Sequence, residues 1–421
     1  MNRRKFLQAG MASMAGWTAY RAFAQNSGAL SMPHPDFLTS EAEIQRAVAK
    51  ASPLHGALIP SDIKRRLGAT HYGGRYFFTD KPYLVEGAEA LLNFGSRSIK
   101  LWLDKRLKGY EFHWQYPLGP QATLLDVLKL PAFQHVLDMP FEVYSFEVGA
   151  AREEEFDRRA TFEQEESEFE ALAGYLYERF HKRNVVFILQ HWEGDWLLRG
   201  NQRDAFRIGN KVDVSERADA MVRWLTARQN GVNRARAAYP NATCRVFHVS
   251  EVNRVYDTLW GLPGVITDVI PHVEVDGVSW SSYDGMGSGP GSAVKTWQGL
   301  DIIEHWSSLG RKKKPFLMIG EVGLPEHRPG LTPPLITQWW DTAMSVFFAR
   351  EIPYIFQWEL FDNETLDKQN KTKPITDISQ LEGFWLIKPD GSLGIGATYL
   401  HALLTNPGGR LPTEVRRSAG I

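Results

Sequence analysis

The chain has 421 residues, of which 43% are hydrophobic and 23% are charged, a composition typical of a folded globular protein. The formal net charge of −1 creates no global field that would attract nucleic acid or an anionic membrane, so we expect neither as a partner. The single cysteine, Cys244, excludes an internal disulfide and a cysteine-based metal cluster.

The first predicted element is a targeting segment at residues 1–24. Asn2–Leu7 (NRRKFL) is similar to a twin-arginine export signal, and a mildly apolar stretch follows from Gln8 to Tyr20. Ala22-Phe23-Ala24 has the small-x-small form of a signal peptidase site. No later stretch is long and apolar enough to span a bilayer. We therefore expect a periplasmic or secreted protein with no membrane anchor in its mature form.

Residues 25–62 are predicted to form an N-terminal extension with a short helix at Glu41–Ala51. From residue 63 to 410, short β-like runs alternate with longer helical patterns, which is typical of βα units and a parallel sheet. The predicted strands are 67–73, 98–103, 141–148, 184–190, 245–249, 277–282, 315–319 and 354–358. The predicted helices are 84–94, 124–137, 162–180, 216–238, 293–309, 334–349 and 396–404, and 411–421 form a C-terminal tail.

These predicted strands close more economically as a (β/α)₈ TIM barrel than as an open sheet. Their continuously apolar character fits strands that are buried on both faces. The alternative is a large doubly wound sheet, which would usually carry a Gly-rich nucleotide-binding fingerprint after an early strand. His71–Gly74 (HYGG) lacks the spacing of that fingerprint. Because the sequence shows no internal repeat and no low-complexity linker, we expect a single catalytic domain.

Two glutamates follow predicted strands at the end of the barrel where barrel enzymes hold their active sites. Glu193 follows strand 184–190 within the segment QHWEGDW, and Glu321 directly follows the apolar run FLMIG. Cleavage of a glycosidic bond needs two carboxyl groups, one that donates a proton and one that is ionised. A solvated loop position for Glu193 and an ion-pair role for Glu321 are the alternatives. The Trp residues around Glu193 and the apolar run before Glu321 argue against them.

This pattern resembles the large clan of retaining (β/α)₈ glycoside hydrolases, over most of the chain apart from its N-terminal segment. The resemblance implies that Glu193 is the acid/base, that Glu321 is the nucleophile and that no cofactor is required. Tyr283 matches an aromatic residue that often hydrogen-bonds the nucleophile in that clan, and Trp358 matches the tryptophan that floors the sugar subsite. The segment 383–391 (GFWLIKPDG) also resembles the last loop of such enzymes.

The residue before Glu193 departs from the pattern of the clan. In much of the clan the acid/base follows an Asn that binds the sugar 2-hydroxyl, whereas here Trp192 stands in that place. Gln190, His191 and Asn253 are candidates to supply the missing hydrogen bond, and His191, Trp192 and Asn253 are predicted substrate contacts.

Other residues near the strand ends are further candidates. Glu251, after strand 245–249, is a possible substitute acid or substrate contact, and His71 ends the first strand as a candidate substrate contact. Asp195 is expected to raise the pKa of Glu193 by like-charge repulsion. Lys100 and Trp102 lie in the second strand, where alternation lets only half of such residues face the interior. Four tryptophans are candidate sugar platforms, with core packing as the alternative for each: Trp114, Trp196, Trp260 and Trp385.

The sequence contains no HExxH motif, no paired His-x-His and no calcium-loop pattern, so no metal site is predicted. The expected function is a retaining glycoside hydrolase that acts on an oligo- or polysaccharide outside the cytoplasm. One alternative is a non-catalytic carbohydrate-binding or polysaccharide-assembly protein with the same barrel. A second alternative is a different barrel enzyme, such as a metal-dependent hydrolase or a lyase.

Overall fold

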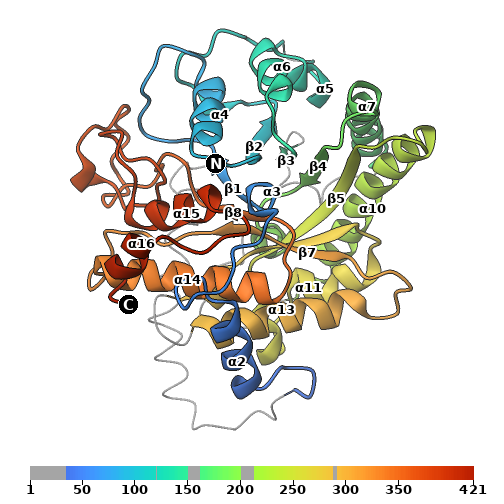
Figure 1. The fold of residues 1–421 in the computed structure, drawn as a ribbon. Helices are drawn as coiled ribbons and strands as arrows, with labels where there is room; N and C mark the ends of the chain where they lie inside the picture. The colour runs from blue at the N-terminus through green and yellow to red at the C-terminus, as the bar shows by residue number, and fades with distance from the viewer. Residues whose placement is uncertain (1–34, 120, 150–161, 201–212, 288–291) are drawn as a thin grey trace.

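The computed structural model describes residues 35–119, 121–149, 162–200, 213–287 and 292–421. In this part of the chain, parallel strands close into a barrel in sequence order, with β1 paired to β8 (Figure 1). The predicted TIM barrel is therefore confirmed. The strands are β1 (Leu67–His71), β2 (Ser98–Asp104), β3 (Val143–Gly149), β4 (Val186–Gln190), β5 (Arg245–Val252), β6 (Gly277–Ser281), β7 (Phe316–Val322) and β8 (Ile355–Gln357).

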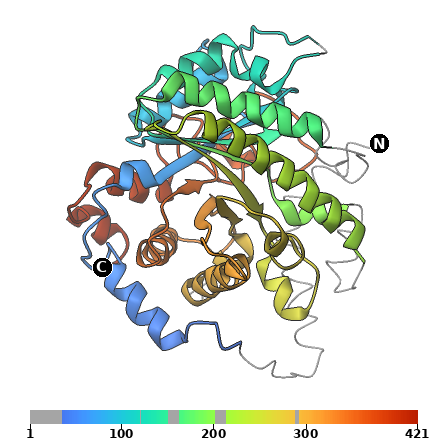
Figure 2. The ribbon, with the colours of Figure 1, turned by 90° about the vertical axis from the view of Figure 1, so that its right-hand side faces the viewer.

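Helices follow the strands and cover the outside of the barrel. The longest of them, α7 and α10, pack side by side (Figure 2). The helices are α2 (Glu41–Ala51), α3 (Ile63–Arg66), α4 (Tyr83–Asn93), α5 (Leu124–Leu128), α6 (Pro131–Asp138), α7 (Glu163–Phe180), α8 (Gly194–Arg199), α10 (Ser215–Ala238), α11 (Val265–Asp268), α12 (Tyr283–Met286), α13 (Ser292–Ser308), α14 (Pro333–Ala349), α15 (Ile395–Thr405) and α16 (Thr413–Ser418). Short 3₁₀ turns are η2 (Lys108–Tyr110), η5 (Val255–Trp260), η6 (Ile270–His272) and η7 (Ile378–Gln380).

The barrel interior changes from apolar to polar along the strands. A compact apolar cluster from β3, β4, β5, β7 and β8 fills its amino-terminal half: Val143, Val186, Ile188, Val249, Met318 and Phe356. Successive residues of a strand alternate between its two faces, so the residue two positions further on faces the same way. On β4, β5 and β8 this step leads from Ile188, Val249 and Phe356 to Gln190, Glu251 and Trp358. Polar and aromatic side chains therefore gather inside the carboxyl-terminal end of the barrel.

The predicted helix 124–137 is wrong as a single element, because the structure divides it into α5 and α6. Pro131 is the first residue of α6. A proline has no N–H to continue a helix from the preceding turn, but it fits the first position of a new one. The other predicted helices and strands are present with small shifts of their ends. β7 extends to Val322, so that Glu321 lies within the strand rather than after it.

The segment before the barrel packs on the barrel's outer helices. α2 contacts α13 and α14 (Figure 1). Asp341 of α14 accepts hydrogen bonds from Ser52 Oγ at 2.5 Å and from the Leu54 amide at 2.9 Å, which fastens the link between α2 and α3. The predicted signal at residues 1–24 lies outside the described residues. Among the residues that are described, no helix has the length and apolarity to cross a membrane.

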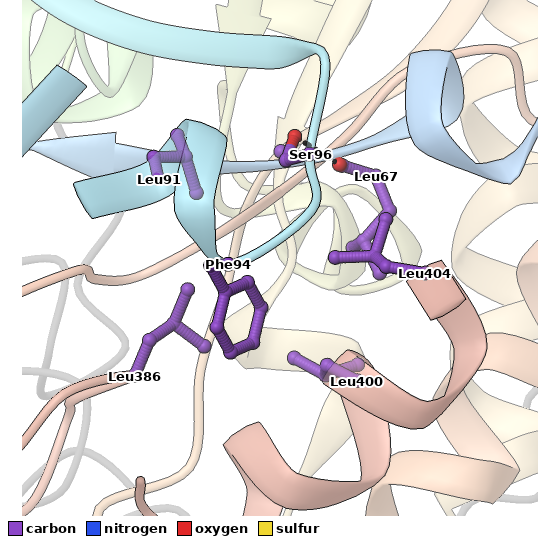
Figure 3. A pocket seen from close by; sticks show the side chains of 8 residues that line it. Leu67, Leu91, Phe94, Ser96, Leu386, Leu400 and Leu404 are labelled. Atoms are coloured by element: carbon purple, nitrogen blue, oxygen red, sulfur yellow. Dashed lines mark hydrogen bonds between the residues drawn. The ribbon is translucent and has the colours of Figure 1, made fainter. Parts of the chain in front are cut away.

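A small apolar gap lies between the start of β1, the end of α4 and α15 (Figure 3). Leucine side chains and Phe94 line most of it, and Ser96 Oγ donates a hydrogen bond to the Leu67 carbonyl at 2.7 Å at its edge. Leu67 is the first residue of β1, so the gap lies away from the carboxyl ends of the strands. It belongs to the packing of helices on the barrel and is no candidate for the functional site.

Candidate active site

Glu193 directly follows the turn after β4 and precedes α8. Its side chain is 8% exposed, and its carboxylate accepts a hydrogen bond from Ser281 Oγ of β6 at 3.0 Å. Its backbone N–H donates to Glu251 Oε1 of β5, also at 3.0 Å. The side chain thus crosses from β4 over β5 toward β6, instead of turning outward into solvent as a loop carboxylate would.

Glu321 lies on β7 and is 5% exposed. It pairs in the sheet register with Ser281, the residue whose hydroxyl holds Glu193. The two predicted glutamates therefore both adjoin Ser281 at the carboxyl-terminal end of the barrel. Within the described part of the chain, Glu321 Oε2 has no hydrogen-bond partner. That oxygen is buried, so its hydrogen-bonding capacity is not used by the described residues.

Burial raises the pKa of Glu321 well above its usual value, and the negative charge of Glu193 raises it further. The positive charge of Lys100 and a hydrogen bond from Tyr283 act in the opposite direction. Two carboxyl groups that repel each other in a buried site hold one proton between them over a wide pH range. The pair can therefore present one protonated and one ionised carboxyl at the same time, as acid/base chemistry requires.

Aromatic side chains lie at the same end of the barrel as the two carboxyl groups. Tyr283 begins α12 and hydrogen-bonds Glu321, as the resemblance implied for its position. Trp358 follows β8 and is 9% exposed, with its ring edge-on to Trp102 at a centroid distance of 5.9 Å. Trp102 in turn stacks on Tyr72 at 4.2 Å. Such flat apolar faces beside polar groups suit the binding of a sugar ring.

A buried polar network lies inside the barrel beneath the pair. Lys100 Nζ contacts Glu147 Oε1 at 2.6 Å, the Gly320 carbonyl at 2.8 Å and Glu251 Oε2 at 3.6 Å. Gln190 Nε2 donates to Glu147 at 2.7 Å and to Glu251 at 3.0 Å. Burial raises the pKa of Glu147 to about 7, against the lowering effect of Lys100. This network lies outside the predicted site residues, although charged residues inside otherwise apolar strands were a sequence signal for it.

Both predicted histidine contacts face away from the carboxylates. The His71 ring packs against Tyr83 of α4, and its Nε2 lies 2.8 Å from the Tyr83 carbonyl. The His191 ring packs against Trp224 of α10, with Nε2 at 2.9 Å from Ser250 Oγ. Burial lowers the pKa of His71 to about 4 and that of His191 to about 3. Both rings therefore pack against outer helices in this structure, and their role as substrate contacts stays a prediction.

Asn253 is engaged by Asp195 rather than directed at the two glutamates. Its Oδ1 accepts from the Asp195 amide at 3.1 Å, and its own amide donates to Asp195 Oδ2 at 2.8 Å. This pair ties the segment after β4 to the segment after β5. Glu251 is 0% exposed and hydrogen-bonded on both carboxylate oxygens, and its role as a substitute acid or substrate contact stays a prediction.

The candidate sugar platforms divide into two kinds. Trp196 and Trp385 are buried to 4% and 3% exposure, and Trp385 donates to Glu326 at 3.0 Å, so both are part of the packed structure. Trp260 is 40% exposed and Trp114 is half-buried. Trp192, next to Glu193, is also half-buried. Among the described residues, no group of three or more His, Cys, Asp or Glu side chains is placed to hold a metal ion.

No protein-family model and no curated protein matches this chain. Solved structures similar to it include a GH5-4 broad-specificity endoglucanase from Clostridium longisporum, with 12% identity, a TM-score of 0.45, and coverage of 83% of this chain and 99% of that chain. A hyperthermophilic β-glucosidase from Pyrococcus furiosus has 10% identity, a TM-score of 0.46, and coverage of 86% and 98%. The GH53 catalytic domain of Ignisphaera aggregans has 12% identity, a TM-score of 0.40, and coverage of 82% and 99%. Similarity at this level is confined to the fold.

Proposed function

We propose that this protein is a retaining glycoside hydrolase in which Glu321 is the nucleophile and Glu193 the acid/base. The observation that carries the proposal is the pair itself: two nearly buried carboxyl groups share Ser281 as a neighbour and repel each other electrostatically. Glycosidic cleavage needs one protonated and one ionised carboxyl group on the two sides of the reacting carbon. The aromatic rings of Trp358 and Trp102 support a sugar as the bound group.

In the first step an oxygen of Glu321 bonds to the anomeric carbon while the glycosidic bond to the departing oxygen breaks. The electron pair of that bond stays on the departing oxygen, which takes the proton from Glu193. In the second step Glu193 removes a proton from water, the water oxygen bonds to the anomeric carbon, and the ester to Glu321 breaks. Lys100 and the Tyr283 hydroxyl both favour the ionised form of Glu321, which this order of events requires.

The test is the release of reducing ends from a panel of plant, fungal and bacterial polysaccharides. Wild type is compared with Glu193→Gln, Glu321→Gln and the control Glu304→Gln, which removes a half-buried carboxylate on the outer helix α13. We expect turnover of at least one glycan, lowered about 10³-fold or more by either active-site variant and unchanged by the control. The first anomer released, followed by proton NMR, should keep the configuration of the substrate. Equal rates in all four proteins would refute the two-glutamate assignment, and binding without turnover would favour a non-catalytic carbohydrate-binding protein.

The proposed site of action is outside the cytoplasm. The support is the sequence Arg3-Arg4 followed by a mildly apolar stretch and Ala22-Phe23-Ala24. Fractionation of cells that express the full chain should find the protein outside the cytoplasm, shortened after Ala24. The Arg3→Lys, Arg4→Lys double variant should remain inside, and equal export of both proteins would contradict the twin-arginine assignment.

A further inference from the structure

We infer that Glu251 is a positioning residue for Glu193: it fixes the backbone of the proton donor from inside the barrel without touching the substrate. This inference rests on the proposed function and adds to it a residue that neither of the two chemical steps uses. Glu251 lies on β5, one strand along from the end of β4, and it is fully buried. A fully buried carboxylate has no surface with which to meet a sugar, so any effect it has on the reaction is exerted through its neighbours.

The contact that carries the inference is between Glu251 Oε1 and the backbone N–H of Glu193, at 3.0 Å. The backbone of Glu193 has φ 33° and ψ 68°, in the left-handed region that residues with a side chain disfavour. The hydrogen bond that this N–H donates to the Glu251 carboxyl oxygen offsets the unfavourable conformation. The conformation matters because it turns the Glu193 side chain toward Ser281 and Glu321 rather than along α8.

The chain next to Glu193 leaves little room for another path. A Cβ atom on Gly194 would come within 2.6 Å of the Glu251 carbonyl oxygen and 2.7 Å of the His191 ring. Glycine is therefore required where the chain passes over β5. The tight passage brings the Glu193 amide down onto Glu251, so that the two features act together to set the position of the proton donor.

Glu251 is itself held rigidly. Its second oxygen, Oε2, accepts hydrogen bonds from Gln190 Nε2 at 3.0 Å and from Ser279 Oγ at 2.9 Å, and it lies 3.6 Å from Lys100 Nζ. These donors come from three other strands, β4, β6 and β2. The orientation of the Glu193 amide is thus fixed by the strands of the barrel and not by the loops at its mouth.

A misplaced proton donor lowers the rate most for substrates whose leaving group depends most on protonation. A general acid acts only within hydrogen-bond reach of the departing oxygen. Aryl glycosides with a weakly acidic phenol depend on protonation, whereas a dinitrophenyl group departs with little help. Loss of Glu251 should therefore lower the rate strongly for the first kind of substrate and weakly for the second, which a general loss of structure would not do.

The experiment compares Glu251→Ala and Glu251→Gln with wild type on a series of aryl glycosides of graded leaving-group pKa. We expect Glu251→Ala to lower kcat/KM about 10²-fold for the poorest leaving group and less than about 5-fold for the dinitrophenyl glycoside. Glu251→Gln keeps an oxygen for the Glu193 amide but turns N–H groups toward donors, so an intermediate loss is expected. Asp341→Asn is the matched control, because Asp341 is a buried carboxylate with donors from Ser52, Leu54 and Tyr399 on the outer helices.

Hydrogen exchange of the peptide that contains the Glu193 amide gives a readout independent of activity. We expect faster exchange there in Glu251→Ala and no change in Asp341→Asn. Unchanged exchange, or a loss of rate that is equal for all leaving groups, would overturn the inference. Should Glu251→Ala not fold, Ser279→Ala removes one anchor of Glu251 and should show the same dependence on leaving group in weaker form. If the proposed function is wrong, wild type will hydrolyse no glycoside. The exchange measurement would still test whether Glu251 fixes the Glu193 amide.

Discussion

Tyr283 and Lys100 are the individual residues that oppose the raised pKa of Glu321. Burial and Glu193 raise the pKa of Glu321, while the charge of Lys100 and the Tyr283 hydrogen bond lower it. The attacking carboxylate has to be ionised, so these two residues act in the direction that catalysis needs. Lys100 is also bound to Glu147 and Glu251, and its removal would disturb three carboxylates at once. Tyr283 offers the cleaner test.

Tyr283→Phe should move the acidic limb of the kcat/KM profile to higher pH. Without the hydroxyl donor the pKa of Glu321 rises further, and at a given pH a smaller fraction of Glu321 is ionised. A hydrogen bond to a charged group contributes about 1.5–3 kcal/mol, so we expect a loss of roughly tenfold or more on the acidic side. Tyr72→Phe is the control, because the Tyr72 ring stacks on Trp102 at the same mouth. An acidic limb that stays in place in Tyr283→Phe would show that this hydroxyl does not govern Glu321.

For individual residues, the sequence does not show which way a side chain faces, and this limits the prediction of the site. Glu321 is predictable because a carboxylate directly after an apolar run is unusual, and Glu193 because tryptophans flank it just after a strand. His71 and His191 have similar positions, yet they face helices α4 and α10. Alternation fixes that neighbouring strand residues face opposite sides, but a short strand buried on both faces does not show which side is the interior. Lys100 can likewise be placed in its strand from the sequence. Its partners Glu147 and Glu251 cannot be predicted, because the sequence does not show which side of the strand faces the interior.

Among the elements, β7 is the strand whose residue choice most directly shapes the site. The register of β7 shifts against both β6 and β8 near its carboxyl end. Gly320 lies at this irregularity, and its carbonyl accepts from Lys100 Nζ at 2.8 Å. A Cβ atom there would come within 2.0 Å of Ser279 Oγ and 2.3 Å of Glu251 Oε2. The strand can therefore carry only glycine at this position if the buried network is to keep its present arrangement.

Gly320→Ala should destabilise the fold and lower activity together. Insertion of a methyl group into a packed interior costs about 1–3 kcal/mol. Gly174→Ala in the middle of α7 is the control, because a Cβ there meets nothing within 4 Å. It should stabilise the protein by about 0.5–1 kcal/mol through helix propensity and leave activity unchanged. Denaturant midpoints measure both changes, and a neutral Gly320→Ala would mean that the network yields to a methyl group without cost.

Element positions were largely predictable from the sequence, and the reason is physical. Each βα unit alternates a short apolar run with an amphipathic segment, and that contrast is local. The division of 124–137 was missed although Pro131 was visible, because a proline is compatible both with a kinked helix and with a new one. Short helices at the mouth, such as α8 and α12, carry no periodic pattern of their own and form only because the strands beneath them fix their ends.

For the molecule as a whole, buried carboxyl groups make stability depend on pH. Burial raises the pKa of Asp284 and of Asp362 to about 7. Burial also raises the pKa of Glu359 well above its usual value, and the negative charge of Asp362 raises it further. In the unfolded chain such groups have pKa values of roughly 4. Between roughly pH 4 and pH 7 the folded state therefore keeps protons that the unfolded state has lost, and the contribution of these groups to stability falls as pH rises.

Glu359→Gln should raise the melting temperature at pH 8 and leave it nearly unchanged at pH 5. Glu359 Oε1 accepts from the Asn363 amide at 2.9 Å, while Oε2 has no partner among the described residues, so a glutamine keeps the bond and carries no charge. We expect a gain of roughly 1–3 °C at pH 8 by calorimetry, because the cost of ionising a buried group disappears. Glu304→Gln, which changes a half-buried carboxylate paired with Arg350 and Lys314, should show no such difference between the two pH values. An equal change at both pH values would contradict the stated cause.

The pairing of β1 with β8 affects how the protein folds during its synthesis. Leu67 finds its sheet partner in Ile355, near the opposite end of the chain. While the ribosome is still making the residues between them, the nascent sheet keeps two unpaired edges, and such edges readily pair with other chains. The barrel therefore closes only after nearly the whole polypeptide has been translated, and a chain cut short before β8 should depend on chaperones or aggregate.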